Sequence, residues 1–262
     1  MKRRQLMRYV GAGVLGTLGT TLASQFQSAE AQSASGTLTV KWLGHTCFLF
    51  TGGGMRILVN PFRTVGCTAG YRPPKVESDL VLISSQLLDE GAAEGLPGNP
   101  RILFQPGVYQ IGGIRFQGIS IPHDRYGGRR LGNNVAWQWE QSGIKLLHLG
   151  GAAAPIEIEQ KILMGRPDVA FVPVGGSIKA YNPREAKDAI AVLNPKMVIP
   201  THFRTQAADE TCQGDYGIEP VDEFLTVMEG MPVSRVNSDT LTLKPSDLPQ
   251  NGSMIKVLSY RF

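Results

Sequence analysis

The sequence predicts a single-domain α/β fold in which two β-sheets are flanked by helices. Short apolar runs alternate with polar, glycine-containing turns through the first half of the chain, a pattern typical of strands. Capped amphipathic segments, typical of helices, come later and in fewer copies. Residues 32–262 contain no linker, internal repeat or low-complexity run, and their length of about 230 residues suits one domain.

The predicted strands form two blocks. In the first block, Gly52-Gly53-Gly54 supplies a hairpin between two of four apolar runs. In the second block, Trp137 and Trp139 alternate with polar neighbours, so they are expected to share one face of a sheet and to pack there. The predicted strands are 38–42, 47–51, 56–60, 80–83, 101–104, 108–111, 114–121, 134–140 and 145–149.

Three helices are predicted. The best marked covers 186–193, because Asn182 is an N-cap residue, Pro183 suits the first turn and Glu185 completes a capping box. A second helix at 220–229 has Phe224, Leu225 and Met228 on one face. Residues 156–164 are the third candidate.

The most informative stretch is 80–91, where a buried strand enters a polar loop. The apolar residues 80–83 are followed directly by Ser84 and Ser85. Several short motifs surround this stretch in a fixed order. They are Gly44-His45-Thr46-Cys47-Phe48, Ile57-Leu58-Val59-Asn60-Pro61-Phe62, Pro122-His123-Asp124, Arg130-Leu131-Gly132-Asn133, His148-Leu149-Gly150-Gly151, Val172-Pro173-Val174-Gly175-Gly176 and Ile199-Pro200-Thr201-His202-Phe203.

In order and spacing, these motifs resemble those of the metallo-β-lactamase-fold hydrolases. The closest likeness is to a small branch with a GHSCF-type start, an ILIDPF-type second strand and a VLITHxHxDHxG metal loop. The resemblance covers almost all of residues 32–262 and implies a four-layered αββα sandwich. In that fold the metal loops gather at one edge of the paired sheets, where His45, Asp89, His123 and His202 would converge.

Most of the metal ligands of this family are absent from the chain. The positions that match HxHxDH hold Ser85, Leu87, Asp89 and Glu90, so only the aspartate remains. Gly151 stands where members of this branch often have the bridging aspartate, whereas His123 and His202 match two later histidines. A dinuclear zinc site needs roughly three protein ligands for each metal and a bridging group. The resemblance therefore implies the fold of a metal-dependent hydrolase with a decayed dinuclear site.

A single metal ion is the alternative at this site. Asp89, Glu90 and His202, with His123, offer a mixture of carboxylate and imidazole that is compatible with zinc, manganese or iron. The competing interpretation is structural: Asp89 and Glu90 would open a helix after the loop, where acidic side chains favour the positive end of the helix dipole. His148 lies inside an apolar strand and is expected to be a core residue.

The mouth of the site is predicted at His45, Asp124 and Arg130. His45 would order it through hydrogen bonds. Arg125, Arg129 and Arg130, which are separated by Tyr126 and glycines, would form an anion-binding loop over it. A solvated loop without a ligand is the alternative.

The first 31 residues predict a twin-arginine export leader. Arg3 and Arg4 precede a mildly apolar stretch at 9–26, and Ala29-Glu30-Ala31 is an A-x-A-like cleavage site. Cleavage would leave residues 32–262 in a periplasm, or in a thylakoid lumen if the source is photosynthetic. An uncleaved anchor is the alternative, but a span needs about 18 consecutive apolar residues and glycines and threonines interrupt this stretch.

Most of the net charge belongs to the leader. The formal charge of the whole chain is +4, and Lys2, Arg3, Arg4 and Arg8 against Glu30 supply +3 of it, which leaves +1 for residues 32–262. No basic stripe remains, so nucleic acid is not an expected partner. Contact with a membrane is expected only during export of the leader.

An oxidising compartment permits disulfide bonds. Cys47 lies among Phe48, Leu49 and Phe50 and is expected to be a buried thiol. Cys67 and Cys212 lie in polar, glycine-containing loops, so they are the pair that would form a disulfide. Three free thiols are the alternative.

These features favour an exported, non-catalytic binding or assembly protein, whose decayed site binds a protein or a small molecule without cleaving it and without a cofactor. The alternative is a hydrolase with a rebuilt mononuclear site at Asp89, Glu90, His123 and His202, acting on an ester, a lactone or a phosphodiester. A serine or cysteine hydrolase is not favoured, because no G-x-S-x-G elbow surrounds Ser84 or Ser85 and no Cys–His pair has a recognisable context.

Overall fold

A computed structural model describes residues 36–262, so the predicted export leader at 1–31 lies outside the described residues. The strands are β1 (Leu38–Gly44), β2 (Cys47–Gly52), β3 (Met55–Val59), β4 (Leu80–Leu82), β5 (Arg101–Leu103), β6 (Gly107–Ile111), β7 (Ile114–Pro122), β8 (Asn133–Gln141), β9 (Ile144–His148), β10 (Val169–Pro173), β11 (Met197–Thr201), β12 (Val233–Arg235), β13 (Thr240–Leu243) and β14 (Met254–Val257). The helices are α1 (Ile158–Met164), α2 (Pro183–Leu193) and α3 (Val221–Val227), and short 3₁₀ turns are η1 (Gly66–Thr68), η2 (Gly214–Tyr216) and η3 (Pro245–Asp247).

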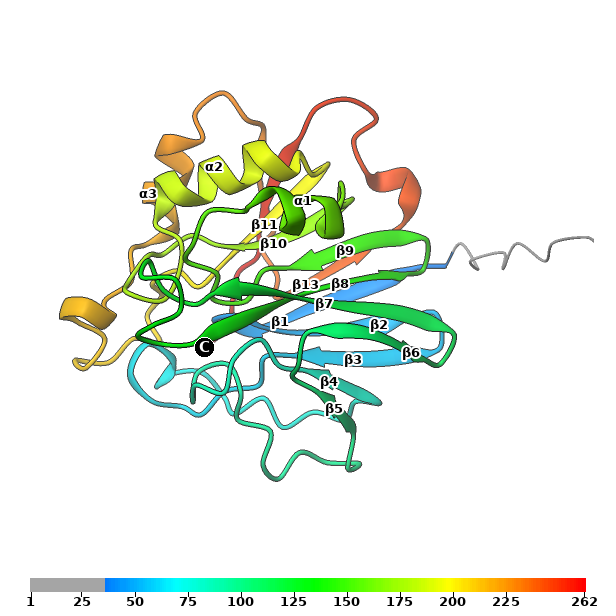
Figure 1. Ribbon diagram of the computed structural model, residues 1–262, viewed down its shortest axis with the longest axis horizontal. Coiled ribbons are helices and arrows are strands. Elements are labelled where there is room, and N and C mark those ends of the chain that lie inside the picture. Colours follow the sequence, from blue (N-terminus) through cyan, green and yellow to red (C-terminus); the bar gives the residue numbers. More distant parts are fainter. Residues whose placement is uncertain (1–35) are drawn as a thin grey trace, which may run out of the picture. The chain divides into compact units, whose positions relative to one another are not determined.

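The strands form two sheets that lie face to face (Figure 1). One sheet has six strands in the order β13-β1-β2-β3-β4-β5, and the other has eight in the order β12-β14-β11-β10-β9-β8-β7-β6. Neighbouring strands from β6 to β9 are antiparallel, whereas β9, β10, β11 and β14 run parallel to one another. The predicted α/β class and the paired-sheet sandwich are confirmed.

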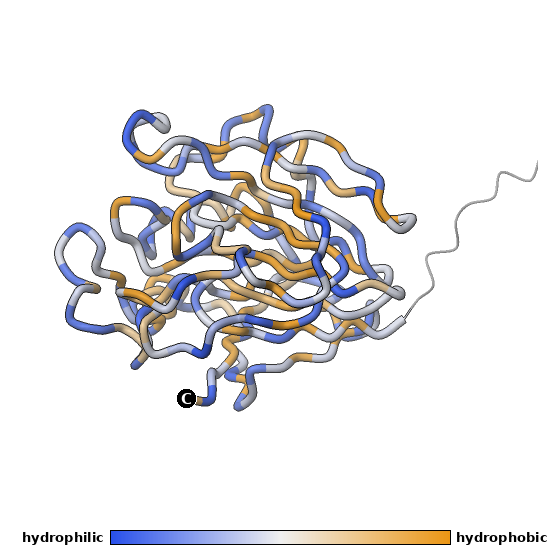
Figure 2. The backbone as a smooth tube through the Cα atoms, turned by 90° about the horizontal axis from the view of Figure 1, so that it is seen from below, coloured by the Kyte–Doolittle hydropathy of each residue, from blue (hydrophilic) through white to orange (hydrophobic). Residues whose placement is uncertain are grey.

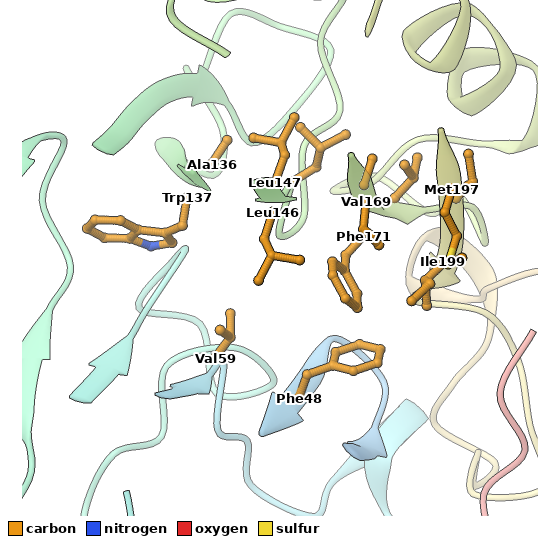
Figure 3. Packing of buried hydrophobic residues seen from close by; sticks show 14 of the residues in the cluster. Phe48, Val59, Ala136, Trp137, Leu146, Leu147, Val169, Phe171, Met197 and Ile199 are labelled. Atoms are coloured by element: carbon orange, nitrogen blue, oxygen red, sulfur yellow. The ribbon is translucent and has the colours of Figure 1, made fainter. Parts of the chain in front are cut away.

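The main core lies between the two sheets. Alternate residues of a strand point to opposite faces, so every second residue of β2 and β3 enters this core. Phe48 and Val59 face Trp137, Leu146 and Phe171 of the other sheet (Figure 3). Trp137 and Trp139 are both buried in this cluster, which confirms that they share an inward face. Hydrophobic stretches of the chain gather towards the middle, whereas the outer loops are largely hydrophilic (Figure 2).

The outer layers of the sandwich differ. Helices α1, α2 and α3 lie together on the side of the eight-stranded sheet (Figure 1). On the outer face of the six-stranded sheet, Cys47, Leu58 and Val81 form a second apolar cluster, which is covered by irregular segments that supply Phe62 and Tyr71. Within residues 36–262 the helix that we expected Asp89 and Glu90 to open does not form: residues 88–90 make a turn and an irregular segment follows. Three glycines and a proline in residues 91–98 disfavour helix propagation there.

Local sequence signals explain the best-defined boundaries. Gly53 and Gly54 have φ of +56° and +77°, which a tight hairpin turn requires, and they connect β2 to β3 as predicted. At the start of α2, Asn182 accepts hydrogen bonds from the N–H groups of Arg184 and Glu185, and the Glu185 carboxylate accepts one from the N–H of Asn182. This capping box confirms the predicted helix start. Among the described residues, no helix combines the length and the hydrophobicity that crossing a bilayer would require.

Candidate functional site

Four side chains from four loops meet at one end of the paired sheets. His45 follows β1, Asp89 lies in the turn after β4, Lys179 follows β10 and His202 follows β11. We call these four residues the pocket cluster. His45 and His202 both have left-handed backbone conformations, with φ of 53° and 52°, and such conformations in non-glycine residues are concentrated at functional sites.

The pocket cluster is arranged around the carboxylate of Asp89. Its Oδ2 atom lies 3.5 Å from Nε2 of His45 and also contacts Nζ of Lys179. The His45 and His202 rings have centroids 4.3 Å apart, and the backbone N–H of His202 donates to the carbonyl of His45 at 3.4 Å. One ligand atom each from His45, Asp89 and His202 can be chosen so that all three lie within 4.8 Å of one another. This is the spacing of groups that share one small cation.

Burial controls the protonation of these groups. Desolvation, with a smaller contribution from the nearby Lys179, lowers the pKa of His45 to about 3. Burial, followed by the charges of His45 and Lys179, also lowers the pKa of His202 well below its ordinary value. Desolvation lowers the pKa of Lys179 to about 8. At neutral pH the two imidazoles are therefore neutral and the lysine is largely charged, so Lys179 is the cation of the cluster.

A second buried pair, formed by Glu90 and His123, does not belong to that group of three possible ligands. Both side chains are inaccessible to solvent, with Oε2 of Glu90 at 3.8 Å from Nε2 of His123. The hydroxyl of Ser85 donates to Oε2 of Glu90 at 3.0 Å. Burial raises the pKa of Glu90 to about 7 and lowers that of His123 to about 4, so near neutral pH His123 is neutral and Glu90 is partly protonated.

Gly151 explains why Glu90 fits into this position. A Cβ atom at residue 151 would lie 2.6 Å from Cε1 of His123 and 2.8 Å from Oε1 of Glu90. Residue 151 is where the related motif often has an aspartate, so the Glu90 carboxylate occupies space that an aspartate side chain would need. The carboxylate beside His123 thus comes from the segment that follows β4.

The pocket cluster lines a cavity of about 400 Å³. Its other walls are mainly apolar and include Leu87, Leu131 and Ile218. A disulfide joins Cys67 in η1 to Cys212 in the loop that follows β11, and Cys67 borders the cavity. Cys47 is a free, buried cysteine.

The loop at 124–131 is held by hydrogen bonds and ion pairs within the chain. The Asp124 carboxylate is buried, which opposes ionisation, but it accepts hydrogen bonds from four backbone N–H groups of its own loop and these lower its pKa. Arg125 forms two hydrogen bonds to the Glu185 carboxylate and two more to backbone carbonyls. Arg130 pairs with Asp215 at 3.6 Å. Arg125 and Arg130 are therefore already engaged by carboxylates.

The metal ions that this fold implies can be tested against these side chains. Ser85, Leu87 and Gly151 cannot replace the missing ligands of a dinuclear centre, and Glu90 is turned towards His123. A single ion fits better, because His45, Asp89 and His202 are close together and the ring nitrogens of both histidines are buried without hydrogen-bond partners among the described residues. Two imidazoles and a carboxylate suit zinc, iron or manganese.

The structure distributes the predicted site residues over three places. Asp89 and His202 lie together, but their neighbour is His45, which we expected at the mouth, whereas Glu90 and His123 form their own pair. Asp124 and Arg130 belong to the neighbouring loop. Sequence reasoning missed Lys179, although it follows Gly175-Gly176 in a loop at the same end of the sheet, and that position was the available signal.

Comparison with known proteins gives consistent matches. The family described as "Beta-lactamase superfamily domain" matches residues 39–202. A UPF0173 metal-dependent hydrolase of Thermococcus onnurineus is 29% identical over 191 residues, which cover 63% of this chain and 84% of the relative. Another protein of that name, from Pelotomaculum thermopropionicum, is 30% identical over 200 residues, covering 64% of this chain and 85% of the relative.

Solved structures agree with these matches. A metallo-β-lactamase superfamily structure from Thermotoga maritima is 28% identical, with a TM-score of 0.64, and the match covers 84% of this chain and 98% of the other. A metallo hydrolase from Ignicoccus hospitalis has a TM-score of 0.55 at 17% identity, covering 79% of this chain and 99% of the other. The second likeness concerns the fold alone.

Proposed function

This chain belongs to the β-lactamase superfamily and to its UPF0173 metal-dependent hydrolase family, and from that premise we propose that it is a binding protein that has lost dinuclear hydrolysis. The observation that carries the proposal is the replacement of the dinuclear ligands. Ser85, Leu87 and Gly151 supply no ligand, and the carboxylate of Glu90 is buried against His123.

The ligand that fits the cavity is a small molecule with a polar end and an apolar body. The cavity of about 400 Å³ is within the range of small-molecule sites, which is roughly 300–1,000 Å³. Asp89 and Lys179 offer one hydrogen-bond acceptor group and one donor group, and Leu87, Leu131 and Ile218 offer apolar contacts. The opposite charges of Asp89 and Lys179 favour a dipolar or neutral polar group over a strongly charged one.

We further propose that the protein works in an oxidising compartment outside the cytoplasm. The twin-arginine pattern at 1–31 supports export. The Cys67–Cys212 disulfide supports the same location, because disulfides persist in oxidising compartments.

A mononuclear hydrolase is the second candidate. It is favoured by the proximity of His45, Asp89 and His202 and by the buried ring nitrogens of the two histidines, which have no hydrogen-bond partner within residues 36–262. These three residues would hold the ion, which would supply a bound water of lowered pKa for attack on an ester, lactone or phosphodiester. The names of the relatives support this candidate.

Elemental analysis and hydrolysis assays distinguish the two candidates. The mature chain is purified from its native compartment without added metal, and zinc, manganese and iron are measured for each chain. Generic esters, lactones and phosphodiesters are then tested with and without a chelator. The binding protein is expected to hold less than a tenth of an ion per chain and to show no chelator-sensitive turnover. About one ion per chain, with turnover abolished in His202→Ala, would establish the hydrolase instead.

Native mass spectrometry of the same preparation tests binding directly. We expect an additional mass from a co-purified small molecule that is lost in Ile218→Trp, which fills the cavity. Val108→Trp is the matched control, because Val108 lies on the exposed edge strand β6 and is 59% accessible. Identical spectra for the wild type and both variants, without bound mass, would contradict the proposal.

A further inference from the structure

Lys179 brings a positive charge into the group of side chains that would hold a metal ion. Its side chain is only 12% exposed, and its Nζ atom contacts Oδ2 of Asp89. The same oxygen lies 3.5 Å from Nε2 of His45. The ammonium group therefore contacts the Asp89 carboxylate, which is one of the three groups that would bind a metal at this site, together with His45 and His202.

The backbone of its loop holds Lys179 in place. The N–H of Ile178 donates to the carbonyl of Asp215 at 3.1 Å, and the N–H of Gly176 donates to that of Tyr181 at 2.8 Å. The N–H of Lys179 itself donates to Oγ of Ser177 at 3.4 Å. These hydrogen bonds hold the backbone of residues 176–179 in one conformation. The Lys179 side chain therefore extends towards Asp89 from a fixed position.

We propose that the Lys179 ammonium is a built-in substitute for the metal cation, and that removing it uncovers a single-metal site at His45, Asp89 and His202. This inference rests on the proposal that the unsubstituted chain works without a metal. It assigns to Lys179 a role in keeping the cluster metal-free.

Charge balance supports this role. A poorly hydrated carboxylate needs a counter-charge, and Lys179 provides it for Asp89. A divalent ion bound to the same oxygen would lie within a few ångströms of the ammonium group. Repulsion at that distance, even at an effective dielectric constant of about 20, weakens binding by on the order of a hundredfold or more. The metal and the charged lysine thus compete for one carboxylate.

Cobalt(II) binding to purified variants tests the inference, because cobalt in a site of nitrogen and oxygen ligands gives a visible absorption spectrum as well as a stoichiometry. The variants are Lys179→Met, Lys179→Gln and Lys179→Arg, with Lys187→Met as the matched control. Lys187 lies on α2, where its ammonium group donates to the carbonyl of Val227. Circular dichroism and thermal unfolding establish that each variant is folded, and Lys179→Gln replaces Lys179→Met if the methionine variant does not fold.

The expected result is that Lys179→Met binds about one cobalt ion per chain, at least a hundredfold more tightly than the wild type. Lys179→Arg and Lys187→Met should resemble the wild type, and His202→Ala added to Lys179→Met should abolish binding. The inference is overturned if folded Lys179→Met or Lys179→Gln binds no more tightly than the wild type. Metal and turnover in the unsubstituted chain would instead refute the proposed function, so the two failures are distinguishable.

Discussion

Glu90 and Gly151 depend on each other for space in the buried interior. A Cβ atom at residue 151 would collide with both Glu90 and His123. The Glu90 side chain therefore fits in its buried position only because residue 151 has no side chain. In return, Glu90 supplies a carboxylate near His123, and the hydroxyl of Ser85 satisfies one of its oxygens. Residues 85, 90 and 151 therefore form one interdependent set.

We expect Gly151→Asp to lower the free energy of unfolding by about 1–3 kcal/mol, because it overpacks a filled site and adds a second buried carboxylate. In Gly151→Asp combined with Glu90→Ala, the aspartate gains the space that Glu90 vacates. The double variant should therefore be more stable than the sum of the single effects by about 1 kcal/mol or more. Urea unfolding of the four proteins of this cycle measures the coupling. Additive effects would show that the two positions do not share one volume.

At the scale of elements, two segments, residues 66–70 and residues 207–212, form one wall of the cavity. The N–H of Gly70 donates to the carbonyl of Ala207 at 2.8 Å, and the N–H of Asp209 donates to that of Gly66 at 3.1 Å. The Cys67–Cys212 disulfide joins the same two segments across 145 residues of sequence. Neither segment belongs to a sheet, so sheet hydrogen bonds do not hold this wall together. The disulfide links the two segments covalently instead.

Cys67→Ser combined with Cys212→Ser should destabilise the chain by about 2–5 kcal/mol, since the closed loop is long and its entropy is restored to the unfolded state. Urea unfolding measures the change. Cys47→Ala is the control for loss of a thiol alone. Thiol titration of the denatured wild type should find one free thiol before reduction and three afterwards. Three free thiols before reduction would contradict the disulfide.

Sequence reasoning predicted elements well where burial dictated the pattern. The strands from β1 to β9 and helix α2 were found because apolar alternation and a complete capping box mark them. Strands β12, β13 and β14 were not predicted, because they have only three or four residues each and are partly exposed. These strands form by pairing with strands that are distant in the sequence, and a local sequence pattern contains no information about such a partner.

The site was predicted less completely for a similar reason. Asp89 and His202 could be found because each follows a buried strand and matches a recognisable motif. Lys179 was missed: its loop position after Gly175-Gly176 was the available signal, but a long flexible side chain in a loop has no periodicity and its partner lies 90 residues away in the sequence. The separation of Glu90 and His123 from the pocket cluster also depends on the space at Gly151, which is a property of the packed structure.

At the scale of the whole molecule, all four histidines of the chain are buried. Burial lowers the pKa of His45 and of His148 to about 3, lowers that of His123 to about 4, and also lowers that of His202. A buried neutral histidine stabilises the fold above its unfolded pKa of about 6.5, and this stabilisation is lost as the pH falls. Glu90 acts in the opposite direction, because burial raises its pKa from 4.5 to about 7.

The chain should therefore lose stability between pH 6.5 and pH 5. Near pH 5 the unfolded chain carries about four histidine protons, whereas the folded chain carries about one proton, on Glu90, so the unfolded chain binds about three more protons. At about 1.4 kcal/mol per proton and pH unit, the steepest slope is about 4 kcal/mol per pH unit. Urea unfolding at closely spaced pH values measures this slope. The variant His148→Asn keeps a hydrogen-bond acceptor for the N–H of Gly150. It removes one titrating histidine, so the difference in bound protons, and with it the slope, should fall by about one proton. A stability that does not change between pH 6.5 and pH 5 would mean that the histidines titrate alike in the folded and unfolded protein, which would contradict their lowered pKa values.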